Sequence, residues 1–173
     1  MRKALLLLLV VLGTSCVSKN LTGTYPAPQQ HYVESKDSFE IVWSKCMDYF
    51  AMNGIAVFAA NKSDGKIISS KISFVNNYTR EVNGRPLNSG AYVVIPTIRN
   101  GFGNILKPSV TRAGSLTMNG DCNVRIRENN GKMIVDVNLS NLDCSYYTGY
   151  RVAKIPIRST GVFEQELLEY LSR

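Results

Sequence analysis

The sequence contains a single histidine, His31, and four cysteines that lie far apart, so it lacks the spacing of a zinc site. A Ser–His–Asp triad would have to be built on His31, which ends a polar segment. The chain also lacks a Gly-Lys-Ser/Thr phosphate loop and a dinucleotide-binding fingerprint. Because no catalytic or metal-binding constellation is visible, we expect a protein that is not an enzyme and holds no cofactor.

Long apolar runs are missing as well, except for Ala4 to Leu12. This run is far shorter than the ~20 residues that a membrane-spanning helix needs. Arg2 and Lys3 precede it, and the small residues Gly13, Thr14 and Ser15 follow it. This order is typical of a signal peptide, so we expect residues 1–15 to be removed.

A strong excess of charge is absent from the remaining chain. Residues 1–15 hold two of the 20 cations, which leaves 18 Lys and Arg against 13 Asp and Glu. This modest basic balance, together with export, argues against nucleic acid as a partner. A domain that starts near residue 31 would hold about 140 residues, enough for one hydrophobic core.

The residues around Cys16 resemble the lipobox of bacterial lipoproteins, in which the cysteine thiol receives a lipid. Small residues precede Cys16, although Gly13 occupies the −3 position where that family usually has an aliphatic residue. An ordinary signal peptidase would also accept Gly13 and Ser15, and either route leaves Cys16 first. We expect lipidation at Cys16 and a membrane as the resulting partner.

Residues 16–30 are polar and contain Pro26 and Pro28, which predicts a flexible tether before a single domain, 31–173. Surface export of Bacteroidetes lipoproteins tends to involve acidic residues just after the cysteine, and "VSKN" has none. We therefore expect an envelope protein at the outer membrane that faces the periplasm.

Two helices are predicted in the domain. The first covers about Ser38 to Asn53, with Asp37 and Glu40 at the spacing of a capping box. Its apolar stripe comprises Phe39, Val42, Trp43, Cys46 and Phe50. The second helix covers about Gly161 to Leu171. We expect its apolar side to pack on a sheet through Phe163, Leu167, Tyr170 and Leu171. Its glutamates should face water; they are Glu164, Glu166 and Glu169.

Two hairpins are predicted from turn signals. Asp64-Gly65 would place Ile55 opposite Phe74 and Val57 opposite Ile72. Asn130-Gly131 would pair Val124 with Val137 and Ile126 with Val135 on an apolar face, and Arg125 with Asp136 on the other. Between the hairpins, "AYVVIPTI" (91–98) predicts a strand, and "RNGFGNILKP" (99–108) predicts a loop or a binding flap.

The three remaining cysteines cannot all pair within the chain. Cys46 falls in the apolar stripe of the first helix, which predicts a buried thiol. Cys122 and Cys144 could form a disulfide if the chain turns back after Asn141, and otherwise they are two separate thiols.

Residues 80–132 are rich in arginine and aromatic residues, which suits an anionic glycan, a lipid or an acidic peptide. The candidate contacts are Arg99, Arg112, Arg125 and Arg127. A solvated sheet face is the alternative interpretation.

These elements predict an α+β fold. We expect an antiparallel sheet of about five or more strands with two helices on one face, in the order β-α-β-β-β-β-α. The first helix with its tryptophan, "NGIAVFAANKSDGKIISS" and the final helix resemble Bacteroidetes lipoproteins of unknown function. That resemblance covers 32–75 and 122–173 and implies a TATA-box-binding-protein-like domain, similar to the repeated domains of lipoprotein C of the barrel-assembly machinery. It implies no catalytic or ligand residue. The function expected is that of a lipid-anchored binding or assembly module with an envelope protein or an anionic glycan as partner.

Overall fold

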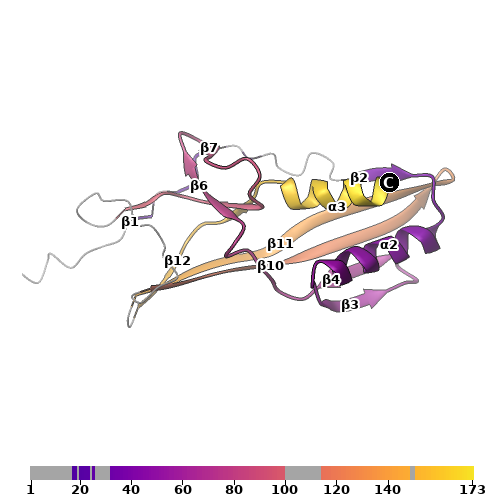
Figure 1. The fold of residues 1–173 in the computed structure, drawn as a ribbon, viewed down its shortest axis with the longest axis horizontal. Helices are drawn as coiled ribbons and strands as arrows, with labels where there is room; N and C mark the ends of the chain where they lie inside the picture. The colour runs from indigo at the N-terminus through magenta and orange to yellow at the C-terminus, as the bar shows by residue number, and fades with distance from the viewer. Residues whose placement is uncertain (1–16, 19, 24, 26–31, 100–113, 149–150) are drawn as a thin grey trace, which may run out of the picture.

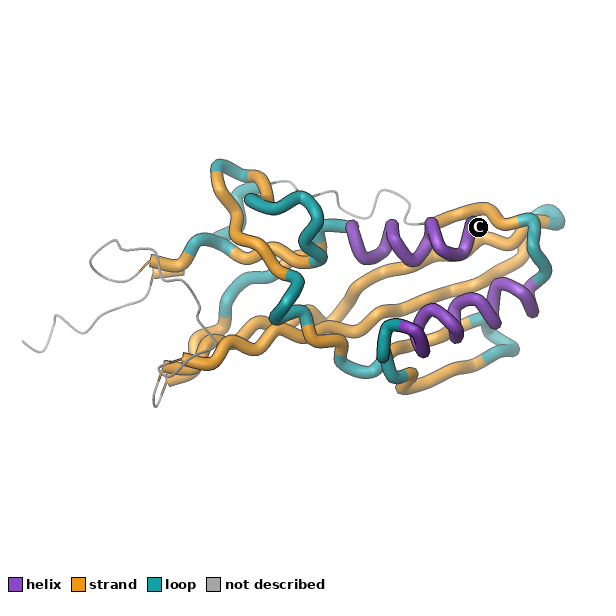
Figure 2. Tube along the Cα trace, in the orientation of Figure 1, coloured by secondary structure: helices purple, strands orange, loops and turns teal. Residues whose placement is uncertain are grey.

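A long hairpin formed by strands β10 (Gly114–Asn129) and β11 (Lys132–Thr148) runs through most of the molecule (Figures 1 and 2). The structure is a computed structural model that describes residues 17–18, 20–23, 25, 32–99, 114–148 and 151–173. Asn130 and Gly131 form the turn with positive φ angles of 52° and 76°, which confirms the predicted Asn-Gly turn. The predicted register is also confirmed, with Val124 opposite Val137 and Ile126 opposite Val135.

The hairpin forms the middle of a seven-stranded sheet in which every pairing is antiparallel. The main path runs β12 (Arg151–Lys154), β11, β10, β4 (Lys66–Ser69) and β3 (Val57–Asn61). In addition, β2 (Tyr32–Ser35) pairs with β11, and β5 (Ile72–Ser73) pairs with β10. The predicted fold class, α+β with a mainly antiparallel sheet, is therefore correct at this level.

The hairpin is irregular between Asn119 and Asp121, where the register shifts. A Cβ on the intervening Gly120 would lie 2.6 Å from the Leu142 side chain and 3.2 Å from the Ser140 carbonyl oxygen. Only glycine fits there without displacing a neighbour. The irregularity divides the hairpin into one part beside the helices and one part beside a second sheet.

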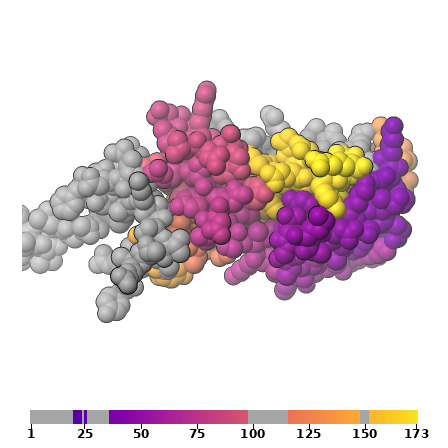
Figure 3. All heavy atoms as spheres, viewed as in Figure 1, coloured from indigo at the N-terminus to yellow at the C-terminus, as the bar shows by residue number. Residues whose placement is uncertain are grey.

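Helices α2 (Phe39–Met52) and α3 (Val162–Ser172) pack side by side on one face of the large sheet (Figures 1 and 3). The predicted stripe of α2 is confirmed, because Val42, Cys46 and Phe50 are buried and Phe39 and Trp43 pack against the same core. Gly54, at φ 64°, ends α2 as a left-handed residue. Helix α3 buries Phe163, Leu167, Leu168 and Leu171.

Both helices begin where predicted, but the capping of α2 and the burial of Glu164 in α3 differ from the prediction. Ser38, not Asp37, is the N-cap of α2, and no side chain caps the helix; Asp37 instead forms an ion pair with Lys45, at 2.6 Å. Glu164 was expected to face water but is 1% exposed. It lies in the first turn of α3, where the partial positive charge of the helix end favours a carboxylate.

The first hairpin has a different register from the predicted one. Ala59 lies opposite Ile68 and Asn61 opposite Lys66, so that four residues, not two, connect β3 and β4. The Asn61 side chain accepts hydrogen bonds from Ser63 Oγ (2.7 Å) and the Asp64 N–H (3.2 Å), which closes this wider loop. Gly65, the last residue of this loop, contacts β10: its carbonyl oxygen accepts a hydrogen bond from the Ile126 N–H.

A second, four-stranded sheet was not predicted. Its order is β13 (Arg158–Ser159), β8 (Val93–Ile95), β6 (Tyr78–Val82) and β7 (Arg85–Pro86). The pairing of β6 with β8 is parallel. Strand β1 (Val17–Ser18) pairs separately with β9 (Ile98–Arg99). The predicted strand within 91–98 is confirmed as β8, but the simple order of seven elements is wrong.

Two regions can now be defined. The helical end comprises 39–52, 57–69 and 162–172, and the small-sheet end comprises 78–99 and 151–159. They lie toward opposite ends of the longest axis, and β1 and β12 lie at the same end as the small sheet (Figure 1). Within the described ranges, neither α2 nor α3 has the length and hydropathy of a membrane-spanning helix.

Candidate functional site

A buried carboxylate, that of Glu81 in β6, holds residues from the segment that follows Cys16. Its oxygens accept hydrogen bonds from the Thr22 N–H (2.9 Å to Oε1), from Thr22 Oγ1 (2.6 Å) and from the Gly23 N–H (3.1 Å to Oε2). The Tyr25 hydroxyl donates to Oε2 as well. We call Thr22, Gly23, Tyr25 and Glu81 the Glu81 cluster. It joins residues almost 60 positions apart in the chain.

The alternation of strand β6 places Glu81 in this cluster. Thr79 and Glu81 are buried, whereas Tyr78, Arg80 and Val82 are more exposed, as expected for side chains that point to alternate faces. Asn83 and Gly84, with φ angles of 52° and 76°, form the tight turn to β7. This Asn-Gly pair is a hairpin signal that the sequence offered and that the prediction did not use.

The hydrogen bonds of the Glu81 cluster favour the charged carboxylate. Burial alone would raise the pKa of Glu81, but the bonds donated by Thr22, Tyr25 and the backbone of Thr22 and Gly23 outweigh burial and lower the pKa from 4.5 to about 2. Burial and the hydrogen bond to Glu81 raise the pKa of Tyr25 well above its ordinary value. The cluster is therefore a carboxylate with neutral donors at neutral pH.

Close packing of backbone adds to these bonds. A Cβ on Gly23 would lie 2.3 Å from the Gly84 carbonyl oxygen, so the two chain segments touch at their backbones. Arg158 Nη1 contacts the Gly23 carbonyl oxygen at 3.4 Å. With β1 paired to β9, the described residues of the predicted tether are docked on the domain.

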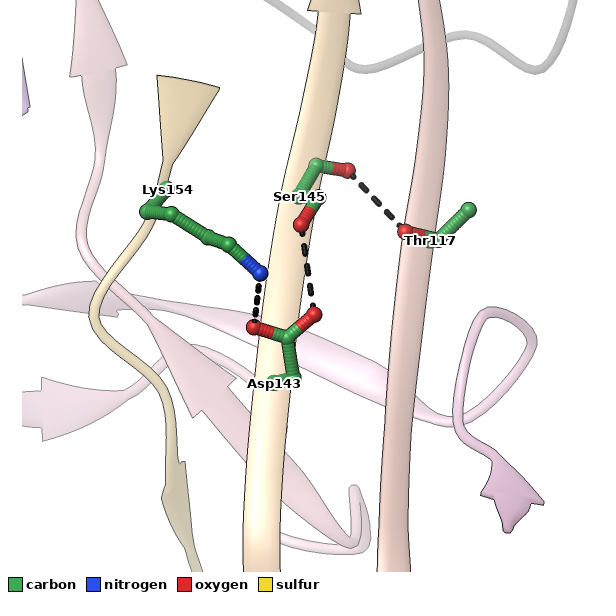
Figure 4. A network of polar contacts seen from close by, with 4 residues as sticks. All are labelled: Thr117, Asp143, Ser145 and Lys154. Atoms are coloured by element: carbon green, nitrogen blue, oxygen red, sulfur yellow. Dashed lines mark hydrogen bonds and ion pairs between the residues drawn. The ribbon is translucent and has the colours of Figure 1, made fainter. Parts of the chain in front are cut away.

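A second polar network fastens β12 to the hairpin (Figure 4). Lys154 Nζ and Ser145 Oγ both donate to the Asp143 carboxylate, the latter at 3.2 Å, and Thr117 Oγ1 contacts the Ser145 carbonyl oxygen at 3.5 Å. The hydrogen bond and the charge of Lys154 lower the pKa of Asp143. Ser145 donates its proton to a carboxylate that is already paired with a cation, which suits a structural contact and not an activated nucleophile.

The predicted basic residues are only partly brought together. Arg125 and Arg127 lie in β10 with their side chains exposed, and Asp136 faces Arg125 in the register, as predicted. The ion pair of Asp136 is formed with Arg127, at 3.1 Å, although Arg125 lies opposite Asp136 in the register. Arg99 lies in β9, in the other part of the molecule, and Arg112 lies outside the described residues.

The three described cysteines are free and buried. The possible Cys122–Cys144 bridge is absent, because Cys122 lies opposite Leu139 and Cys144 lies opposite Met118. Burial raises the pKa of Cys46 and of Cys144 to about 12, and it raises the pKa of Cys122 too. These thiols are core residues. Cys16 and His31 lie outside the described residues.

Two of the surface hollows are lined by described residues. One, of about 470 Å³, lies between residues 53–56 and 70–73, with Lys71 as its charged side chain. The other, of about 230 Å³, lies over β4, β10 and β11 and is lined in part by Lys66, Arg125 and Asp136. Within the described ranges, no group of three or more His, Cys, Asp or Glu side chains is placed to hold a metal ion.

Comparison with known proteins adds no assignment to this geometry. No protein-family model matches the chain, and no curated protein is significantly similar to it.

Proposed function

We propose that this chain is a lipid-anchored protein of the bacterial cell envelope, in which the α+β domain is a non-enzymatic binding or assembly module. The observation that carries the proposal is the position of Cys16 between a signal-like segment and docked chain. The apolar run and the small residues end at Cys16, and β1 begins at the next residue.

The rest of the molecule supports a binding role. The polar groups of the described site residues serve to hold segments together, as in the Glu81 cluster and the Asp143 network. Large surfaces remain open, including the sheet face that carries Arg125 and Arg127, opposite the buried side chains of β10. We propose an outer-membrane anchor with the domain in the periplasm.

The test is a substitution at Cys16 in the full-length chain expressed with its own N-terminus. Cys16→Ser should abolish incorporation of an alkyne-labelled fatty acid and shift the protein from the membrane fraction to the soluble fraction. Ser15→Ala keeps a small residue before the cysteine and should leave both readouts unchanged. An unlabelled, soluble wild-type protein would overturn the proposal.

A second candidate function is binding of an anionic glycan or acidic peptide to the open sheet face. Lys66 and Arg125 flank the 230 Å³ hollow there, which favours a ligand with negative charge. Arg125→Glu should then reduce retention of labelled acidic glycans by the soluble Cys16→Ser protein, and Lys45→Glu, in α2 on the other face of the sheet, should not. Equal retention by the two variants would argue against this site.

A further inference from the structure

Very little chain separates Cys16 from the folded domain. Val17 follows Cys16 directly and already belongs to β1, which pairs with β9. Since consecutive Cα atoms are 3.8 Å apart, a lipid on Cys16 is attached within one residue of the sheet. The Glu81 cluster holds the residues that come next, so that the segment cannot act as a long tether while docked.

The small-sheet end, next to this attachment point, is basic. Among the side chains that the structure describes there, the cations are Arg80, Arg85, Lys154 and Arg158, and the acid is Glu81, whose carboxylate is engaged in the Glu81 cluster. Lys154 is paired with Asp143 of the neighbouring strand β11. A surface of this sign is attracted to anionic lipid head groups.

Apolar side chains accompany these cations. Val82 is 44% exposed and Leu87 is 62% exposed, on either side of the β6–β7 turn. Tyr147 and Val152 lie opposite each other in β11 and β12 and are 40% and 56% exposed. An aromatic ring and aliphatic groups beside cations are the composition of a surface that contacts the head-group region.

The helical end has the opposite charge. It holds three cations, Lys45, Lys62 and Lys66, against six acids. These acids are Glu40, Asp48, Asp64, Glu164, Glu166 and Glu169. Repulsion from an anionic bilayer would direct this end away from it, so charge and attachment point favour the same orientation.

We propose that the small-sheet end is a membrane-contacting surface that lies against anionic lipid head groups, with the helical end directed away from the bilayer. This orientation rests on the proposed function, because it takes Cys16 as the point of attachment. The docked segment then sets the height of the domain above the membrane, and the helices and the open face of the large sheet remain accessible to a partner.

Two measurements test the orientation. The first is hydrogen exchange of the acylated full-length protein on phosphatidylcholine vesicles with about one third phosphatidylglycerol, compared with the Cys16→Ser protein in solution. We expect exchange to slow severalfold in residues 82–90 and 147–154 and to stay unchanged in residues 57–69. Equal protection of both regions, or protection of 57–69 alone, would overturn the orientation.

The second measurement does not depend on acylation. The Cys16→Ser protein is sedimented with the same vesicles, and binding should disappear when the salt concentration reaches about 1 M. Arg85→Glu with Lys154→Glu should weaken binding about tenfold or more. The matched control is Lys36→Glu, just before α2, with Lys62→Glu; it changes the charge equally and also breaks one exposed lysine ion pair.

The two proposals can fail separately. Absence of a lipid on the wild-type protein refutes the anchor, whereas equal loss of vesicle binding in both double variants refutes the basic surface. Absence of any vesicle binding by the Cys16→Ser protein, together with unprotected 82–90 in the acylated protein, also refutes the surface while leaving the anchor intact.

Discussion

Each end of the molecule contains a buried glutamate that accepts hydrogen bonds. The donors at the two ends belong to different parts of the fold. At the helical end, Glu164 accepts a hydrogen bond from the Leu139 N–H (3.2 Å) of the central strand β11. It accepts another from Ser159 Oγ (2.9 Å) in β13, where the small-sheet end adjoins α3. At the small-sheet end, Glu81 binds donors of an N-terminal segment that lies at the periphery. Donors in a central strand cannot leave without unfolding the sheet, whereas a peripheral segment can detach into water.

The apolar core reinforces this contrast. The buried cluster is built mainly from α2, α3 and the large sheet, with Val93 and Ile95 as the contribution of β8. Among the residues of the N-terminal segment whose burial is described, Tyr25 is the buried aromatic one. The helical end is therefore held by packing, and the attachment of the N-terminal segment is held by polar contacts around one carboxylate.

The largest effect is expected from Phe163→Ala in α3. The Phe163 ring contacts Tyr49, Phe74 and Tyr92, with ring centroids 6.3, 6.4 and 5.4 Å away, and is 3% exposed. Removal of such a ring leaves a cavity and should lower the free energy of unfolding by about 3–5 kcal/mol in urea titrations.

Phe58→Ala is the control for that substitution, because Phe58 is 79% exposed on the edge strand β3. Its effect should stay within about 0.5 kcal/mol. Similar losses in the two variants would contradict the assignment of the core to the face covered by α2 and α3.

Substitution of the two glutamates tests the comparison directly. Glu164→Ala leaves the Leu139 N–H without its partner inside the sheet and should lower the free energy of unfolding by about 1–3 kcal/mol. Glu81→Ala should change global stability less, because the N–H groups of Thr22 and Gly23 can form hydrogen bonds with water once the segment detaches. The measurement is urea unfolding combined with hydrogen exchange of residues 20–25.

The decisive readout is where exchange increases. In Glu81→Ala it should rise in residues 20–25 and not in residues 133–139, and Glu164→Ala should show the reverse. An increase across both segments in both variants would mean that the two ends unfold as one unit and that the distinction drawn between them is wrong.

The elements that were predicted correctly are those with strong local signals. The Asn130-Gly131 turn set the register of its flanking strands, because a two-residue turn with positive φ angles leaves few alternatives. The periodicity of α2 identified its buried face. The register of β3 and β4 was wrong because the side chain of Asn61 closes a longer loop, a contact that turn statistics for Asp-Gly do not include.

The candidate site was not predictable in the same way. Glu81 and Glu164 are charged residues, and sequence patterns place such residues in water unless a partner is known. Their partners, Thr22 and Leu139, lie 59 and 25 positions away. The parallel pairing of β6 with β8 is equally non-local. Cys16 is the exception: its importance comes from local processing signals, and it remains a prediction.

The smallest effect on global stability is expected from acid, and it should appear at the small-sheet end. The pKa of Glu81 is lowered from 4.5 to about 2 in the folded protein. The stability that the docked segment draws from the charged carboxylate is therefore complete above about pH 4.5 and is lost as pH falls toward 2, where protonation occurs in the folded state as well. Hydrogen exchange of residues 20–25, corrected for the intrinsic effect of pH, should thus show loss of protection between pH 4.5 and 2 while residues 133–139 stay protected.

The Glu81→Ala protein should show no such transition, because it lacks the titrating group. Unchanged protection of residues 20–25 at pH 2 in the wild-type protein would mean that β1 and the contact of Gly23 with Gly84 hold the segment without the carboxylate.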